Sequence, residues 1–290
     1  MNLISDTRSG DRIRILDGET AGIRRMDAFF HGAPFSRHRH DSYAIGVTLF
    51  GIQCFFYRGC RHHARRGQIH ILYPDEVHDG AAGTEDGFGY RISYIDPWLL
   101  QQAIGGRGLP FVRNPVQSPN AAWRSCLGKL WQADFCDDEI LRAEFAVAAV
   151  DCLEAAAGSR SADRRSLIAM RGLNRVREAI ADNPVCRLDA TELEKLADMD
   201  RWSLARGFRA AFGTSPTRYR TLRQLERVRA SIEAGMPLAQ AALNAEFSDQ
   251  SHMTRRFRGA FGMSPRQWKL ASRGARPDAQ SFKNSRQLQF

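Results

Sequence analysis

The feature that most constrains the fold of this chain is an internal repeat in its carboxy-terminal third. The segment FRAAFGTSP at Phe208–Pro216 returns 49 residues later as FRGAFGMSP at Phe257–Pro265, and seven of the nine positions are identical. In both copies a glycine follows an apolar helical pattern, at a point where helices often end in the left-handed region, and a proline opens the next segment. The chain therefore contains two copies of one helical unit.

The same order of elements precedes both copies of the repeat. A short helical pattern at Thr191–Ala197 and a polar break come before a basic helical pattern at Arg201–Phe212. In the second copy the two patterns are Leu238–Ala245 and Gln250–Phe261. Two helices joined by a turn of about three or four residues form a helix-turn-helix unit. The sequence predicts two such units within an all-α domain at residues 167–271.

The charge distribution indicates a polyanionic partner for this domain. Residues 166–290 hold 22 Lys and Arg against 12 Asp and Glu, whereas residues 1–165 hold 20 of each. A solubilising basic surface is the alternative for charge alone, and two helical hairpins with solvated basic faces are the alternative for the repeat. Two copies that both place arginines on the outer face of the second helix favour binding to double-stranded DNA.

The candidate DNA contacts lie on the outer faces of the second helices. Arginine reads guanine and holds phosphates, and Gln, Ser or Thr at the start of a helix reaches base edges. The predicted DNA-binding residues are Arg201, Trp202, Ser203, Arg206, Arg209, Gln250, Ser251, His252, Thr254, Arg255 and Arg258.

The apolar residues of the amino-terminal half are spaced differently from those of the helical repeat. This difference predicts an α+β chain of two domains. Short apolar bursts separated by glycines are typical of a small β-barrel. They are Tyr43–Phe50, Cys54–Tyr57, Ile69–Tyr73 and Tyr90–Ile95. Two amphipathic helices follow at 121–132 and 138–157, where they cover the barrel or form a dimer seam. The predicted boundaries are 10–157 for this domain, 158–166 for a linker and 272–290 for a disordered basic tail.

Several functional classes find no support in the sequence. The six cysteines have no close spacing and indicate reduced thiols in a cytoplasmic protein. We find no secretory signal and no apolar run of the roughly 18 residues that a membrane span needs. We also find no phosphate-binding loop or catalytic motif. We therefore expect no enzyme, no cofactor and no membrane partner.

Residues Arg171–Trp268 resemble the DNA-binding domain of the AraC family of regulators. The matching motifs are L-x-x-L-A at Leu193–Ala197, SLARGFRAAFG at Ser203–Gly213 and FSDQSHMTRRFR at Phe247–Arg258. The resemblance implies that a long helix over Arg223–Glu233 joins the two units and places both reading helices on one side of the duplex. It also implies activation of transcription, contact with RNA polymerase and a homodimer. Ala245 stands where a glycine is common, and we expect that position to need a positive φ.

Residues His38–Val47 and Arg58–Gly80 resemble the cupin-like sensor domain of such regulators. Seven of the eight histidines lie between His31 and His78. Three of them resemble the metal ligands of cupin enzymes, but the expected acidic residue after the first pair is missing, so we assign no metal. An unknown small-molecule effector would bind inside the barrel. The predicted lining residues are His38, His40, Tyr43, Glu76, His78 and Tyr90. A cupin-type enzyme with a basic domain, or an architectural DNA-binding protein without a ligand, are the competing functions.

Overall fold

The computed structural model describes residues 11–16, 22–105, 107–131, 138–157 and 167–273. The strands are β1 (Arg12–Ile15), β2 (Ile23–Phe30), β3 (Phe35–His38), β4 (Tyr43–Tyr57), β5 (Cys60–Arg65), β6 (Ile69–Leu72), β7 (His78–Ala82), β8 (Phe88–Ile95) and β9 (Val116–Gln117). The helices are α1 (Pro97–Ile104), α2 (Ala121–Leu130), α3 (Glu139–Ala157), α4 (Leu167–Asp182), α5 (Ala190–Ala197), α6 (Arg201–Phe212), α7 (Pro216–Glu233), α8 (Leu238–Asn244), α9 (Gln250–Phe261) and α10 (Pro265–Arg273).

The N-terminal domain is built around the long strand β4, which belongs to two sheets. Its first part pairs with β6 and β8, and its second part pairs with β5 and β7. The sequence predicted two separate strands here because Gly51 interrupts the apolar pattern. The strand instead continues through Gly51, which has a φ of +64°, beside a register shift between Thr48 and Phe50. An irregularity of this kind bends a strand without ending it, so one strand serves both sheets.

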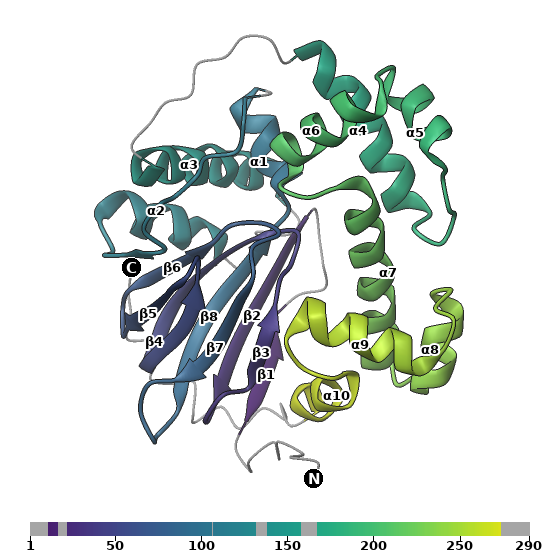
Figure 1. Cartoon of the computed structure of the whole chain (residues 1–290). Coiled ribbons are helices and arrows are strands. Elements are labelled where there is room, and N and C mark those ends of the chain that lie inside the picture. Colours follow the sequence, from purple (N-terminus) through teal and green to yellow (C-terminus); the bar gives the residue numbers. More distant parts are fainter. Residues whose placement is uncertain (1–10, 17–21, 106, 132–137, 158–166, 274–290) are drawn as a thin grey trace.

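Apolar side chains cover both faces of these sheets. The interior of the N-terminal domain contains Phe30, Phe55 and Tyr90, among other buried side chains. Helices α1, α2 and α3 lie together on one side of the sheet (Figure 1). They pack against the outer face of β4 and β6, where Tyr43 and Ile69 are buried. The helices α2 and α3 lie close to the ranges that the sequence predicted, whereas α1 was not predicted. Its start is set by Asp96, whose carboxylate accepts a hydrogen bond from the Trp98 N–H, and by Pro97 at the first helical position.

The helical domain, α4–α10, contains the two predicted units, α5–α6 and α8–α9 (Figure 1). Helices α6 and α9 have the bounds that the sequence predicted, and each buries two phenylalanines on its inward face: Phe208 and Phe212 on α6, Phe257 and Phe261 on α9. The connecting helix α7 begins earlier than the predicted Arg223, at Pro216, because the Ser215 hydroxyl caps it. Ser272 and Arg273 belong to α10, two residues beyond the predicted boundary.

The expectation about Ala245 was wrong by one residue. Ala245 has a φ of −100°, and the residue with positive φ is Glu246, at +57°. In the first unit the equivalent residue is Asp198, at +55°. Ala245 is buried while Glu246 is exposed. The turn of each unit therefore places its left-handed residue on the surface, where an acidic side chain occupies it.

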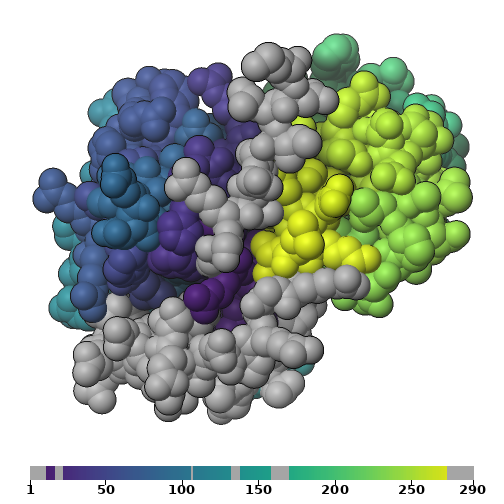
Figure 2. All heavy atoms as spheres, turned by 90° about the horizontal axis from the view of Figure 1, so that it is seen from below, coloured from purple at the N-terminus to yellow at the C-terminus, as the bar shows by residue number. Residues whose placement is uncertain are grey.

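The two domains share one apolar core at their junction. The interior of the N-terminal domain is continuous with buried residues of α7, α9 and α10, including Leu225, Phe257 and Trp268. Figure 2 shows the yellow carboxy-terminal helices packed directly against the purple first strands, and α10 lies on β1. The predicted linker 158–166 and residues 274–290 of the predicted tail lie outside the described residues. Among the helices of the described residues, none is long and apolar enough to cross a membrane.

Candidate nucleic-acid interface and domain junction

Helices α6 and α9 carry the predicted DNA contacts on their outer faces. On α6, Arg201, Trp202, Arg206 and Arg209 are exposed, and Ser203 is half-buried. The indole of Trp202 is notable because a large apolar side chain is 70% exposed on a basic face. The corresponding side chains of α9 are exposed at Gln250, Ser251, Arg255 and Arg258, and half-buried at His252 and Thr254. The structure thus divides the predicted residues into two sets, one on each helix.

Two of these residues also contact the segments that precede their own helices. Arg201 reaches back to α5, where its Nε lies 2.9 Å from Glu194 Oε1 and its backbone N–H donates to the same oxygen. The His252 ring lies 5.6 Å from the Phe247 ring and 3.2 Å from the Ser248 hydroxyl through Nδ1. These contacts orient the start of each reading helix, and they leave Arg201 exposed and His252 half-buried.

Sequence reasoning missed the aspartates that start both reading helices. The Asp200 carboxylate accepts hydrogen bonds from the N–H groups of Trp202 and Ser203 at 2.9 and 3.1 Å. The Asp249 carboxylate accepts from the His252 N–H at 2.6 Å. The Ser203 side chain and then its backbone N–H lower the pKa of Asp200, and the His252 backbone N–H lowers the pKa of Asp249. An aspartate directly before an apolar helical pattern is an N-cap signal that could have identified them.

Three of the predicted effector-binding residues gather inside the N-terminal domain. The ring centroids of His38 and His78 lie 4.2 Å apart, and those of His40 and His78 lie 4.8 Å apart. Each Nδ1 donates to a backbone carbonyl oxygen two residues away, at 2.7 to 2.9 Å. Burial lowers the pKa of His38 to about 4, that of His40 to about 3 and that of His78 well below its usual value. The three rings are therefore neutral, with Nδ1 protonated.

The other predicted lining residues separate. Tyr90 lies in the same core, whereas Tyr43 points to the opposite side of β4, where its hydroxyl donates to the Pro110 carbonyl oxygen at 2.7 Å. Glu76 forms an ion pair with Arg58. Among the described residues, no group of three or more His, Cys, Asp or Glu side chains could hold a metal ion.

The sequence reasoning also missed His70, which is fully buried between the sheets. Its ring centroid lies 6.0 Å from that of Tyr90, and a Cβ at Gly46 would overlap its Nε2. Burial lowers the pKa of His70 to about 3. Within the described part of the chain, both ring nitrogens and the Thr48 hydroxyl are buried without a hydrogen-bond partner. Such atoms are costly to bury, so His70 and Thr48 leave hydrogen-bonding capacity unused in the interior.

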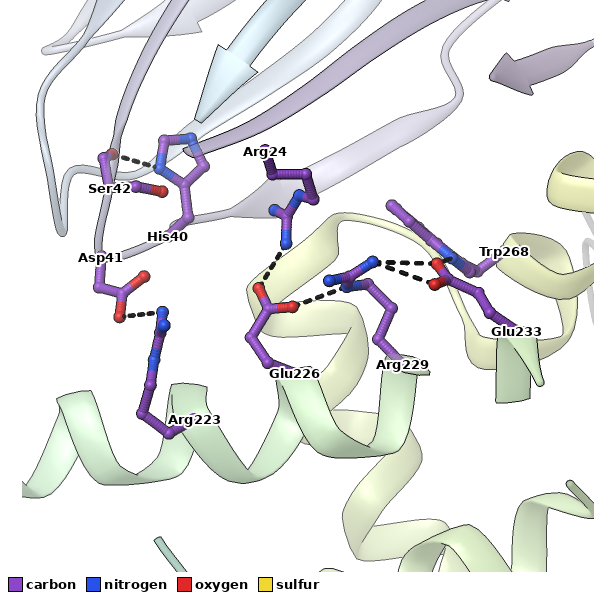
Figure 3. Close-up of polar contacts among 9 residues, drawn as sticks. All are labelled: Arg24, His40, Asp41, Ser42, Arg223, Glu226, Arg229, Glu233 and Trp268. Atoms are coloured by element: carbon purple, nitrogen blue, oxygen red, sulfur yellow. Dashed lines mark hydrogen bonds and ion pairs between the residues drawn. The ribbon is translucent and has the colours of Figure 1, made fainter. Parts of the chain in front are cut away.

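The junction between the domains contains an ion network centred on α7 (Figure 3). The Glu226 carboxylate lies 2.6 Å from Arg24 Nη1 on β2 and 2.6 Å from Arg229 Nε on its own helix. Arg229 continues to Glu233, which accepts a hydrogen bond from the Trp268 indole at 2.8 Å. Burial acts to raise the pKa of Glu226, but Arg24 and Arg229 hold it well below its ordinary value. One carboxylate thus links the sheet to the connecting helix.

The N-terminal domain also touches the same point of both reading helices, namely the glycine at the carboxy-terminal end. At α9, the Ser36 N–H donates to the Gly262 carbonyl oxygen at 2.9 Å, and the Arg39 N–H donates to the Gly259 carbonyl oxygen at 3.1 Å. At α6, a Cβ on Gly213 would lie 2.5 Å from the Pro74 Cβ. The repeat therefore supplies two equivalent docking points for one domain.

The close approach at Gly213 leads to a stability prediction. Gly213→Ala should cost more than Gly105→Ala by about 1 kcal/mol, because both positions have positive φ but only the first meets a neighbour. The Gly105 variant measures the backbone strain alone, since nothing lies within 4 Å of its Cβ position. Urea unfolding of both variants checks the difference. Equal losses would show that Pro74 does not contact the end of α6 in solution.

The comparisons with known proteins match both domains. Residues 20–142 match the family model for the AraC-like ligand-binding domain, and residues 193–271 match that for a helix-turn-helix domain. ToxT from Vibrio cholerae aligns with a TM-score of 0.62 at 9% identity, covering 87% of this chain and 99% of that one. ToxT bound to an unsaturated fatty acid aligns with a TM-score of 0.59 at 10% identity, covering 92% and 98%. At such low identity the likeness shows a shared fold. No curated protein matches by sequence.

The fold and the exposed basic helices define a DNA-binding regulator that carries a ligand-binding domain ahead of two helix-turn-helix units. The chain belongs to the AraC family of transcription regulators.

Proposed function

We propose that this protein is an effector-responsive transcription activator that reads two successive major grooves with α6 and α9. The observation that carries the proposal is the equivalent exposure of two basic helices that one connecting helix, α7, holds in a single domain. Successive major grooves are about 34 Å apart, so one chain reads two neighbouring half-sites. The DNA contacts in this proposal are the predicted residues of α6 and α9 other than Arg209, whose guanidinium lies 3.7 Å from the Asp75 carboxylate of the N-terminal domain. The protein acts in the cytoplasm and performs no catalytic step.

The effector in this proposal is a small molecule with hydrogen-bonding groups that enters the interior of the N-terminal domain. His38, His40 and His78 lie beside the docking point on α9, since a Cβ on Gly262 would lie 2.8 Å from His38 Nδ1. A ligand among these rings would therefore act on the junction directly. It shifts the protein between two states only to the extent that it binds one of them more tightly.

Two partners complete the proposal. Helix α3 exposes Ile140 and Val147, which are 73% and 52% accessible and lie two turns apart on one face. This face serves as the seam of a homodimer, while the opposite face of α3 covers the sheet. Activation requires contact with RNA polymerase, which an exposed surface of the DNA-bound helical domain provides.

The proposal is tested by selecting bound sequences from random DNA with the full chain at about 0.15 M salt, where non-specific electrostatic binding is weakened. We expect a motif of two boxes about one helical turn apart. Recovery of no motif by the folded chain, with and without cell extract as a source of effector, would contradict it.

Arg206→Ala should weaken binding to the selected motif by about 1–3 kcal/mol, with a much smaller effect on random DNA, because an exposed arginine of α6 reads a base edge. Fluorescence anisotropy on both DNAs measures the two losses. Arg124→Ala, an exposed arginine of α2, is the matched control and should leave both affinities unchanged. Equal losses on both DNAs would assign Arg206 to a phosphate.

A further inference from the structure

Asp75, in the turn between β6 and β7, lies among arginines from three separate segments. Its carboxylate oxygens are 3.8 Å from Arg39 Nη1, 3.7 Å from Arg209 Nη2 and 2.5 Å from Arg218 Nε. Arg39 belongs to the N-terminal domain, Arg209 to the last turn of α6 and Arg218 to the first turn of α7. One carboxylate of the N-terminal domain therefore lies in a cationic cluster to which α6 and the connecting helix α7 each contribute one arginine.

The backbone holds Asp75 in place while the arginines around it stay open to solvent. Asp75 has a positive φ of 61°, which is unfavourable for a side chain larger than glycine, and its N–H donates to the His40 carbonyl oxygen at 2.7 Å. The Asp75 side chain is 5% exposed, whereas those of Arg209 and Arg218 are 66% and 34% exposed. Adjacent Pro74 fixes the same turn against Gly213. Asp75 thus adopts an unfavourable backbone conformation that places its carboxylate among the arginines.

The cationic cluster contains more positive charge than Asp75 neutralises. Burial lowers the pKa of Arg218, and although Asp75 opposes this effect, the neighbouring Arg39, Arg209 and Arg256 lower the pKa further. Arg256 is an exposed residue of α9, so both reading helices contribute charge to this region. An excess of guanidinium groups around one carboxylate suits a larger anion, and guanidinium groups bind phosphate oxygens in the same fork geometry as carboxylates.

We propose that Arg209 and Arg218 form a binding site for a phosphate of the DNA backbone, and that Asp75 occupies this site as an internal substitute when the domains are joined. The inference rests on the proposed DNA-binding function and adds its regulation. Sequence reasoning assigned Arg209 to DNA without a role and did not single out Arg218, Arg39 or Asp75. In the joined state the two arginines contribute little to DNA affinity, and separation of Asp75 releases them for a phosphate.

Salt dependence of DNA binding tests the inference, because each phosphate that a protein neutralises adds about 0.9 to the slope of log K against log salt concentration. For the full chain carrying Asp75→Asn, we expect a slope steeper by about 1–2 and binding at least about tenfold tighter at low salt, on both the selected motif and random DNA. Asp41→Asn is the matched control. It breaks another ion pair of the junction, with Arg223 on α7 at 2.8 Å, and should leave the slope unchanged.

Arg209→Ala provides a second, independent measurement. In the unaltered chain we expect it to change DNA affinity by less than about twofold, whereas in the Asp75→Asn background it should reduce affinity about tenfold and return the slope towards that of the unaltered chain. A large loss from Arg209→Ala in the unaltered chain would overturn the inference even if Asp75→Asn failed to fold.

The remaining outcomes separate the inference from the proposed function. An unaltered chain that binds its motif, together with a folded Asp75→Asn chain of the same slope and affinity, would overturn the inference alone. An equal gain from Asp41→Asn and Asp75→Asn would also overturn it, because general loosening of the junction would then explain the effect. Failure of every chain to bind any DNA would overturn both.

Discussion

Acidification from pH 6 to pH 5 is expected to lower the free energy of unfolding of the full chain by roughly 4 kcal/mol. The cause is a set of four buried histidines in the N-terminal domain, His38, His40, His70 and His78. Burial lowers the pKa of His38 to about 4, those of His40 and His70 to about 3, and that of His78 well below its usual value. In the unfolded chain the same side chains titrate near their ordinary pKa of about 6.5.

The sign of the change in the free energy of unfolding follows from proton uptake by the unfolded chain. Between the ordinary pKa and the lowered values, the unfolded chain binds protons that the folded chain excludes, so stability falls as the pH decreases through this window. Each histidine contributes about 1.4 kcal/mol per pH unit once its unfolded form is protonated. Denaturant unfolding at pH 7, 6, 5.5 and 5 measures the slope, and His70→Gln should reduce it by about a quarter. A stability that does not change from pH 7 to pH 5 would show that these imidazoles are not buried in neutral form.

The reading helices could be predicted from the sequence because local signals agree there. The aromatic periodicity of Arg201–Phe212 and Gln250–Phe261 marks the inward face, and Gly213 and Gly262 mark the ends. Both glycines have positive φ, at 73° and 74°, as an end of this type requires. Turn, period and helix end are properties of neighbouring residues, so they need no knowledge of the rest of the fold.

The faces of β4 could not be predicted in the same way. Alternation along a strand separates its two faces, but it identifies the interior only when one face is polar. Here both faces are buried, since α1–α3 cover the side that Tyr43 occupies and the interior holds Ala44. Tyr43 was assigned to the effector site because its segment resembles a cupin-like domain, and that resemblance does not fix the face of β4 that the side chain occupies. The orientation of such a strand is a property of the packed domain.

The buried ion network between the domains could not be predicted from the sequence for a related reason. Arg24, Glu226 and Arg229 are charged residues, and charged residues on a strand or helix usually indicate a solvated face. Their burial depends on how the helical domain docks on β1 and β2, which no local pattern encodes. The sequence predicted two domains separated by a linker, whereas the structure shows a core shared between them.

Glu226→Gln is expected to lower the free energy of unfolding of the full chain by about 3 kcal/mol, because it removes the carboxylate that lies between two buried guanidinium groups, of which Arg229 keeps its pair with Glu233. The Arg24 and Arg229 side chains are each only 6% exposed, so water cannot replace the lost carboxylate. The 16% exposure of Glu226 itself places the expected loss at the lower end of the range for buried pairs. Urea unfolding followed by tryptophan fluorescence measures the loss at pH 7.

A matched surface pair separates this effect from the loss of any carboxylate. Glu144 pairs with Lys129 across α2 and α3 and is 52% exposed, so Glu144→Gln should cost no more than about 1 kcal/mol. Replacement of Arg24 by Met in the Glu226→Gln chain should recover part of the stability, because it removes the buried guanidinium that faced Glu226 from β2 and leaves an apolar side chain in the shared core. Equal losses from Glu226→Gln and Glu144→Gln would instead mean that water fills the junction, and that the two domains are held together by the apolar contacts of α9 and α10 alone.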